Sequence, residues 1–376
     1  MRIVLTGGGT GGHFFPALAV ARELKNIVQN NLFAIPPGEG ASLEILFMGP
    51  ETVGEELLLQ EGIRHKKIMA GKIRRYASLK NILDILKFPF GLIQSLWHLF
   101  WFMPNAIFSK GGFGSVPVVL AAWLYGIPIL IHESDSVPGL ANKFGAKFAK
   151  RVAVSFPSAA SFFPQKKIAL TGNPVRKEIL GGTKEDAKSA FVGFTGFKST
   201  LLVLGGSQGA KAINQIILDS LPKLLNRCEI IHQCGKENFE EFKTLFNQKP
   251  PEGYFLAPFL DENQLRAAFG ATDIVISRAG ATSIAEISVL KKPSILIPLP
   301  SAAADHQSKN ATEYASAGAA VVISQANLVS GLFIDQIFNL LDNPDLMKKM
   351  NDAAGAFNPP DAARKISQEL LNIAKW

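Results

Sequence analysis

The sequence predicts a two-domain α/β protein in which two Rossmann-like, doubly wound parallel sheets face each other across a cleft. Its 376 residues exceed one ordinary domain, and a hydrophobic content of 47% can fill two cores. A short apolar segment that ends in glycines occurs at 3–5 and again at 201–204. Each is typical of a buried strand followed by a tight turn and a helix, so the second half repeats the plan of the first.

The first glycine turn, from Gly7 to His13, is the most informative stretch of the chain. It follows the strand at 3–5, and Pro16 with the apolar spacing after it is expected to open an amphipathic helix. Free backbone N–H groups and the positive end of a helix suit a phosphate or the oxygens of a sugar. His13 stands at the mouth of this turn and can exchange a proton near neutral pH.

The rest of the chain follows the same alternation. Apolar runs predict further strands at 43–48, 106–109, 129–132, 151–155, 229–233, 273–277 and 294–298. Helical spacing is expected at 51–60, 118–125, from 139 onward, through 286–290 and at 361–375. Residues 63–69 suit a strand or a loop edge, 31–42 a loop and 170–176 a hinge. We expect an N-terminal domain at 1–172, a C-terminal domain at 173–357 and a final helix, 358–376, that crosses back.

The positive charge of the chain is concentrated in the N-terminal half. Residues 1–172 hold 18 basic and 10 acidic side chains, or +8, whereas the remainder balances at 21 of each. Nine of those basic residues lie between Gly62 and Lys110, where Asp84 is the only acid. The same region contains the most apolar stretch, 79–108, which is too interrupted to span a bilayer. We expect one or two helices with an exposed aromatic side that binds an anionic membrane surface, although a helix buried on the sheet would explain part of the pattern.

Several other functions fit the sequence poorly. No apolar signal segment precedes the glycines, and Cys228 and Cys234 are typical of reduced thiols in the cytosol. His232 lies between these cysteines without a fourth ligand, so we expect no metal site. Gly7-x-Gly9-x-x-Gly12 matches the dinucleotide fingerprint, but no acidic residue closes a second strand at the required distance. Tyr76 and Lys80 match a dehydrogenase pair only formally, and no glycine turn continues as a P-loop.

Taken together and in order, the motifs resemble a family of bacterial GT-B glycosyltransferases that add N-acetylglucosamine to a lipid-linked peptidoglycan precursor. The resemblance covers essentially the whole chain. It rests on Gly8-Gly9-Thr10-Gly11-Gly12-His13, Lys110-Gly111-Gly112-Phe113, His132-Glu133, Gly172-Asn173-Pro174-Val175-Arg176, Gly205-Gly206-Ser207-Gln208-Gly209-Ala210, Arg278-Ala279-Gly280-Ala281 with Glu286, and Asp305-x-Gln307 before Asn310.

The resemblance implies an inverting transfer. UDP-N-acetylglucosamine donates its sugar to the 4-hydroxyl of undecaprenyl-pyrophosphoryl-N-acetylmuramyl-pentapeptide (lipid I), giving lipid II and UDP for peptidoglycan synthesis. It also implies a peripheral enzyme on the cytoplasmic face of the cell membrane, bound to the anionic inner leaflet, with no required cofactor and no nucleic-acid partner. The sequence leaves open the dependence on a divalent ion, the oligomeric state and the peptide stem of the acceptor.

Site residues follow from the same resemblance. His13 is the expected general base, with Glu133 as the competing base or an orienting partner; a structural histidine and a helix-capping carboxylate are the alternatives. The acceptor is expected to contact Gly12, His13, Gly112 and Phe113. The donor is expected to contact Thr10, Gly11, Gly12, Asp135, Arg176, Ser207, Gln208, Gly209, Leu260, Ala281, Thr282, Ser283, Glu286 and Gln307. Among these, Glu286 would bind the ribose hydroxyls and Arg176 the diphosphate.

The chain departs from the family pattern at three of these motifs. Asp135 stands where the family commonly has Asn, Phe113 replaces a frequent Tyr, and Ser308 replaces a frequent second Gln. These differences affect the sugar contacts that the resemblance implies, and not the reaction class. The 31–42 loop is longer than the family usually carries and has no role that the sequence assigns.

Two other functions remain open from the sequence. One is a different GT-B protein that uses a UDP-sugar, such as an epimerase or a glycolipid synthase. The other is a non-catalytic protein of membrane surfaces or nucleic acid, prompted by a pI near 9.3. Nucleic acid is disfavoured because the basic residues adjoin Trp97, Phe100 and Trp101 in one apolar run, and not stacking aromatics on polar strands.

Overall fold

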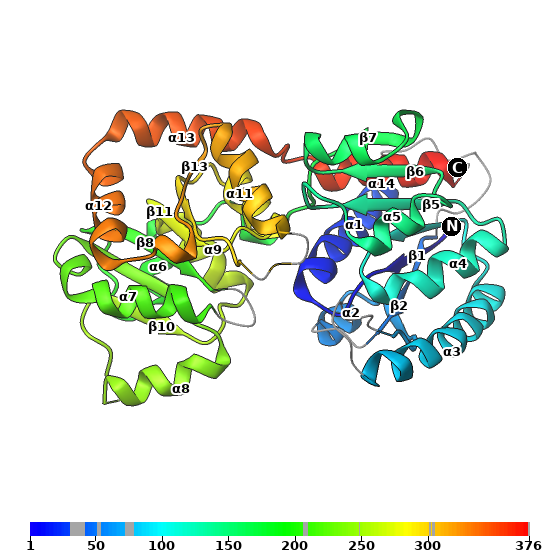
Figure 1. Ribbon diagram of the computed structural model, residues 1–376, viewed down its shortest axis with the longest axis horizontal. Coiled ribbons are helices and arrows are strands. Elements are labelled where there is room, and N and C mark those ends of the chain that lie inside the picture. Colours follow the sequence, from blue (N-terminus) through cyan, green and yellow to red (C-terminus); the bar gives the residue numbers. More distant parts are fainter. Residues whose placement is uncertain are drawn as a thin grey trace. The chain divides into compact units, whose positions relative to one another are not determined.

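The computed structural model describes residues 1–30, 42–50, 54–71, 79–205, 210–247, 249–300, 302 and 305–374, with the backbone alone for 79–86. The chain divides into two compact units, Met1–Val175 with Pro359–Trp376 and Arg176–Asn358. Each unit is built on one parallel sheet flanked by helices (Figure 1). This confirms the predicted pair of Rossmann-like parallel-sheet domains, while the cleft between them stays a prediction.

The first unit contains a seven-stranded sheet in the order β3-β2-β1-β4-β5-β6-β7. Its strands are β1 (Arg2–Thr6), β2 (Glu44–Gly49), β3 (Arg64–Lys67), β4 (Ala106–Ser109), β5 (Ile129–Glu133), β6 (Arg151–Val154) and β7 (Ile168–Leu170). Its helices are α1 (Gly11–Gln29), α2 (Glu55–Gln60), α3 (Leu79–Phe102), α4 (Val116–Leu124), α5 (Leu140–Gly145) and α14 (Ala362–Ile373). All neighbouring strands run parallel, so their carboxyl ends share one edge.

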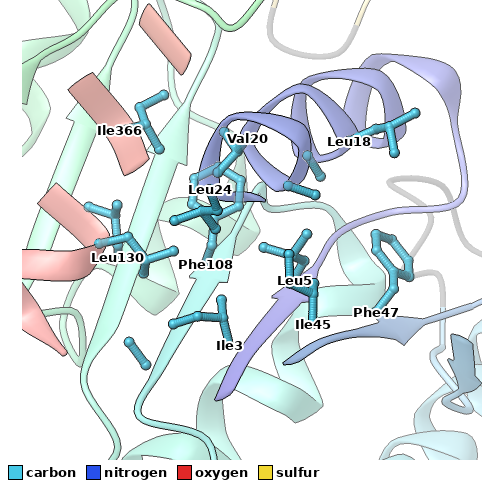
Figure 2. Packing of buried hydrophobic residues seen from close by; sticks show 14 of the residues in the cluster. Ile3, Leu5, Leu18, Val20, Leu24, Ile45, Phe47, Phe108, Leu130 and Ile366 are labelled. Atoms are coloured by element: carbon cyan, nitrogen blue, oxygen red, sulfur yellow. The ribbon is translucent and has the colours of Figure 1, made fainter. Parts of the chain in front are cut away.

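Helices α1 and α14 cover the same face of this sheet. Figure 2 shows Val20 and Leu24 of α1 and Ile366 of α14 over Phe108 and Leu130 of the central strands. All five side chains are inaccessible to solvent. The final helix therefore belongs to the core of the first unit, although it follows the second unit in the chain.

Helix α1 begins earlier than the sequence suggested. Pro16 was expected to open it, but the helix starts at Gly11 and Pro16 lies inside. Proline has a helical φ and lacks only its own N–H, so the lost bond is the one to the carbonyl four residues earlier. That carbonyl belongs to Gly12, which is exposed at the helix end, where water can take the place of the missing donor.

Helix α3 is a single helix through Pro89 and Gly91. From Gly91 onward its buried positions are Gly91, Ser95, Leu99 and Phe102, three or four residues apart, so they share one face of the helix. A Cβ on Gly91 would lie 1.9 Å from the carbonyl oxygen of Met69, so only glycine permits this close approach. Among the described residues no helix is both long enough and apolar enough to cross a membrane.

The second unit contains a six-stranded parallel sheet in the order β10-β9-β8-β11-β12-β13. Its strands are β8 (Ser199–Leu204), β9 (Cys228–Gln233), β10 (Tyr254–Ala257), β11 (Ile274–Ser277), β12 (Ser294–Leu296) and β13 (Ala320–Val322). Its helices are α6 (Lys184–Ala190), α7 (Lys211–Leu224), α8 (Lys236–Leu245), α9 (Glu262–Ala271), α10 (Ala281–Val289), α11 (His306–Ser316), α12 (Ser330–Leu341) and α13 (Pro344–Phe357).

Candidate active site

The first glycine turn places the N-terminus of α1 at the carboxyl edge of the first sheet. Thr10 is the N-cap residue, and its carbonyl oxygen accepts bonds from the backbone N–H groups of His13 and Phe14, both at 3.0 Å. Gly11 and Gly12 form the first helical positions. A Cβ on Gly12 would meet no atom within 4 Å, so open space lies over this end of the helix. Backbone donors and the helix dipole are therefore available to a ligand here.

His13 is held by its own turn and by a second glycine turn. Its Nδ1 lies 2.9 Å from the Thr10 hydroxyl oxygen. A Cβ added to Gly8 would lie 3.1 Å from Nδ1, and one added to Gly112 would lie 3.2 Å from Nε2. His13 is half-buried, and the surrounding backbone displaces most of its water. The imidazole thus lies between Gly8 and Gly112, where any larger residue would crowd the ring.

The pKa of His13 is lowered to about 4. Burial between the two turns is the largest cause, and the positive charge of Lys110 adds to it, whereas the negative charge of Asp135 opposes it. Near neutral pH the ring is therefore uncharged and carries a lone pair. When Nδ1–H donates to Thr10, that lone pair is on Nε2, the atom a general base would use.

The second turn, Gly111-Gly112, follows β4 and needs glycine at both positions. Their φ angles are +84° and +82°, which other residues adopt only with strain. A Cβ on Gly112 would lie 3.0 Å from Cα of Gly8, so the two turns touch. Phe113 starts a short 3₁₀ helix directly afterward and is half-buried.

Glu133 ends β5 and is bound by the loop that follows. Its carboxylate accepts hydrogen bonds from the backbone N–H of Asp135 at 2.9 Å and of Gly139 at 3.1 Å, and from Nδ2 of Asn142 at 2.9 Å. The side chain is 2% exposed. Burial and the neighbouring charge of Asp135 raise the pKa of Glu133. These contacts are those of a carboxylate that holds the 134–139 loop and the start of α5; its role as a base stays a prediction.

Two buried polar side chains at this edge, Lys110 and His132, lie outside the predicted set of site residues. Both belong to motifs that the sequence displays, at the ends of β4 and β5. Lys110 is 1% exposed and His132 is fully buried. A polar residue at the end of a buried strand is the sequence signal that could have identified both residues. That their side chains are buried is shown only by the structure.

In the second unit, Arg176 and Glu286 contact each other directly. Nε and Nη2 of Arg176 donate to Oε1 of Glu286 at 3.0 and 2.8 Å. Both side chains are nearly inaccessible to solvent. The sequence assigned them to different parts of the donor, the diphosphate and the ribose. The other carboxylate oxygen of Glu286, Oε2, accepts no hydrogen bond from the described residues.

The other predicted donor residues lie on loops and helix starts of the same unit. Ala281, Thr282 and Ser283 form the first turn of α10, after its N-cap Gly280. Leu260 is 1% exposed, and its backbone N–H donates to Oε1 of Gln233 at 3.0 Å, so its side chain is covered. Ser207, Gln208 and Gly209 lie outside the described residues.

Gln307 is held by the loop before α11, which Arg278 braces. Oε1 of Gln307 accepts the backbone N–H of Leu299 at 3.0 Å. Arg278 donates to the carbonyl oxygens of Ile297 and Pro298 at 3.0 and 3.1 Å, and to Oε1 of Gln325 at 2.9 Å. The sequence assigned no role to Arg278, which here fixes the course of a loop that follows β12.

Within the described part of the chain, no group of three or more histidine, cysteine, aspartate or glutamate side chains could hold a metal ion. His232 uses both ring nitrogens, with Tyr254 at 2.8 Å and Asn214 at 3.0 Å. Burial lowers its pKa to about 3. This histidine is therefore part of a buried hydrogen-bond network.

Comparison with known proteins gives consistent matches. Residues 3–154 match the glycosyltransferase family 28 N-terminal domain, and residues 200–366 match its C-terminal domain. A Bacillus cereus protein named UDP-N-acetylglucosamine–N-acetylmuramyl-(pentapeptide) pyrophosphoryl-undecaprenol N-acetylglucosamine transferase 2 is 37% identical, over 98% of this chain and 99% of its own length. A Bacillus thuringiensis protein of the same name is 34% identical over the full length of both.

Solved structures agree with these matches. The crystal structure of Acinetobacter baumannii MurG is similar with a TM-score of 0.72 and 26% identity over 99% of both chains. A UDP-GlcNAc 2-epimerase from Neisseria meningitidis, solved with bound UDP-GlcNAc, has a TM-score of 0.69 over 99% of this chain and 100% of its own. At 14% identity the epimerase shares the fold alone.

Proposed function

The chain belongs to glycosyltransferase family 28, among the N-acetylglucosaminyltransferases that act on N-acetylmuramyl-(pentapeptide) pyrophosphoryl-undecaprenol, and from this we propose how its residues carry out that transfer. UDP-N-acetylglucosamine is the donor and lipid I the acceptor; lipid II and UDP are the products. The enzyme thereby completes the disaccharide unit of the peptidoglycan precursor.

The observation that carries the mechanism is the uncharged His13 at the edge of the first sheet. The acceptor hydroxyl gives its proton to Nε2, its oxygen forms a bond to the anomeric carbon, and the bond from that carbon to the diphosphate breaks. UDP departs with the electron pair. Because the oxygen enters opposite the leaving diphosphate, the configuration inverts. Open space over Gly12 and the exposed N-terminus of α1 suit the sugar hydroxyls of the substrates.

The second unit binds the donor in this proposal. Glu286 accepts hydrogen bonds from the ribose hydroxyls through Oε2, while Arg176 neutralises the diphosphate as negative charge develops on it. The first turn of α10 adds backbone donors through Ala281, Thr282 and Ser283. Because Arg176 bonds to Glu286 through Nε and Nη2, the two residues hold each other beside the donor in this proposal.

We also propose that α3 attaches the enzyme to the cytoplasmic face of the membrane. Trp97, Phe100 and Trp101 are 61%, 58% and 64% exposed on the described part of this helix. Lys66 and Lys87 lie exposed in the same region. Large aromatic side chains beside lysines suit the headgroup layer of an anionic leaflet, where the acceptor lipid resides. Single exposed aromatics are ordinary, whereas a cluster of this size is not.

Release of UDP tests the proposed transfer. Purified full-length chain is incubated with UDP-N-acetylglucosamine, with and without a short-chain lipid I analogue. We expect UDP to appear only with the acceptor. An epimerase would convert the donor without the acceptor, and a non-catalytic protein would leave it unchanged; either result would refute the proposal.

A further inference from the structure

Lys110 directly follows β4 and lies beside Gly7 of the first glycine turn. The register pairs Ser109 with Thr6 on one side and with Ile131 on the other, so the next position places Lys110 beside His132. Phe108, two residues earlier, faces the core under α1, and side chains alternate along a strand. Lys110 therefore points to the face that carries α1 and, at its N-terminus, His13.

His13 and Lys110 leave the backbone close together. A Cβ built on Gly7 would lie 3.4 Å from Cβ of His13 and 3.5 Å from Cβ of Lys110, which puts these two atoms within about 7 Å. The bond from the Lys110 backbone N–H to the Thr6 carbonyl, at 2.8 Å, fixes the lysine in this register.

The ammonium group of Lys110 is buried without a hydrogen bond. The side chain is 1% exposed, and Nζ has no hydrogen-bond partner in the described part of the protein. Nδ1 of His132 is also buried without a partner, while its Nε2 lies 3.1 Å from the Gly172 carbonyl oxygen. The charged or titratable groups that act on Lys110, His13 and His132 come from α1, β5 and the loop after it, and are His13, His132, Glu133 and Asp135.

Burying an ammonium group without a hydrogen-bond partner lowers the stability of the folded protein. A function of Lys110 would therefore explain its position. Glu133 is bound by its own loop, and the three groups that donate hydrogen bonds to its carboxylate do not include Lys110. Lys110 is also too deeply buried to contact a substrate. Its charge reaches the reaction only through the electrostatic field at neighbouring groups.

We propose that Lys110 is a positioning residue for the base: its buried ammonium, close to His13 and to the Glu133–Asp135 turn, opposes protonation of the His13 imidazole before the acceptor hydroxyl gives up its proton. Asp135 would by itself attract a proton to this ring. The lysine offsets that charge, so the site keeps a carboxylate near the sugar while its base remains neutral. The inference rests on the proposed role of His13.

Burial lowers the pKa of Lys110 to about 8, while Glu133 and Asp135 oppose that shift. The lysine is therefore mostly charged at pH 7 and loses its charge on moderate alkalinisation. Its influence on His13 is strongest at and below neutral pH, the range in which His13 could gain a proton.

The test is an NMR titration of His13 in the full chain, labelled with ¹⁵N-histidine and assigned by loss of its signals in His13→Gln. Lys110→Met should raise the pKa of His13 by about one unit, the size expected for removal of one nearby charge. Asp135→Asn in the same background should lower it again. Lys147→Met, which removes an exposed lysine of the same unit, is the control and should leave it unchanged.

The acid limb of kcat/KM should move to higher pH by the same amount in Lys110→Met, because that profile reports groups of the free enzyme. An unchanged His13 pKa in the folded variant would overturn the proposal and leave Lys110 a purely structural residue. If Lys110→Met does not fold, ¹³Cε-lysine spectra of the wild-type protein decide: a lysine that titrates near pH 8 in step with a second shift of the His13 signals supports the proposal. A His13 signal that stays constant there refutes it. The titrations need no substrate, so absence of transfer would refute the proposed function separately.

Discussion

One substitution, Gly12→Ala, should raise the stability of the protein and lower its activity. Gly12 is the second residue of α1, it is exposed, and a Cβ there would meet nothing within 4 Å. Gly12→Ala should therefore stabilise the protein by about 0.4–1 kcal/mol, because alanine loses less conformational entropy on folding. For a unit of this size, that corresponds to a rise in Tm of roughly 1–4 °C.

Activity should change in the other direction. If the substrates lie against this end of α1, the added methyl group occupies their space, and kcat/KM should fall at least about tenfold, or ~1.4 kcal/mol. Gly331→Ala is a matched control, because Gly331 is also the exposed second residue of a helix, α12, with nothing within 4 Å of a Cβ. It should stabilise similarly and keep full activity. Equal activity of the two variants would show that no substrate contacts Gly12.

Three further predictions concern the base, the donor and the membrane. His13→Ala should lower kcat by about 10²–10⁴-fold and leave the affinity for UDP, measured by calorimetry, unchanged. Loss of UDP binding would show that the residue is structural. In the wild-type enzyme kcat/KM should fall only as the pH approaches about 4, because His13 stays neutral above that pKa. The wild-type protein should bind UDP about 10–100-fold more tightly than 2′-deoxy-UDP, and Glu286→Gln should largely remove that difference, since it weakens a bond to a charged acceptor; an unaltered ratio would place the ribose elsewhere. Replacing Trp97 and Trp101 by Ser should reduce binding to vesicles of anionic lipid in a sedimentation assay while leaving UDP affinity intact, and undiminished binding would move the membrane surface to another face.

The sequence predicted the parallel-sheet architecture because that signal is local. An apolar run that ends in glycine marks a strand and its turn, and the predicted strand at 106–109 coincides with β4. The predicted start of α1 was wrong. Proline commonly opens helices, and the exposure of Gly12, which allows Pro16 to lie inside this one, is known only from the structure. Glu133 was expected as a possible base, and no sequence pattern reveals that its carboxylate accepts three bonds from its own loop.

Charge interactions were the least predictable part of the candidate site. Arg176 and Glu286 are 110 positions apart, and the resemblance assigned them to different parts of the donor, yet they bond to each other. In the sequence, Lys110 is the last of the nine basic residues between 62 and 110 and the first residue of a family motif, and it was given no role in the site. Its register beside His132 turns it inward, and only the sheet pairing shows this.

The most direct test of the central claim follows the sugar itself. Radiolabelled UDP-N-acetylglucosamine is incubated with the full-length enzyme and a short-chain lipid I analogue, and the lipid fraction is extracted and counted. We predict that label enters the lipid with wild-type protein, at a rate reduced by about 10²–10⁴-fold in His13→Ala. A lipid fraction that stays unlabelled, under conditions in which an established family member labels it, would contradict the assignment.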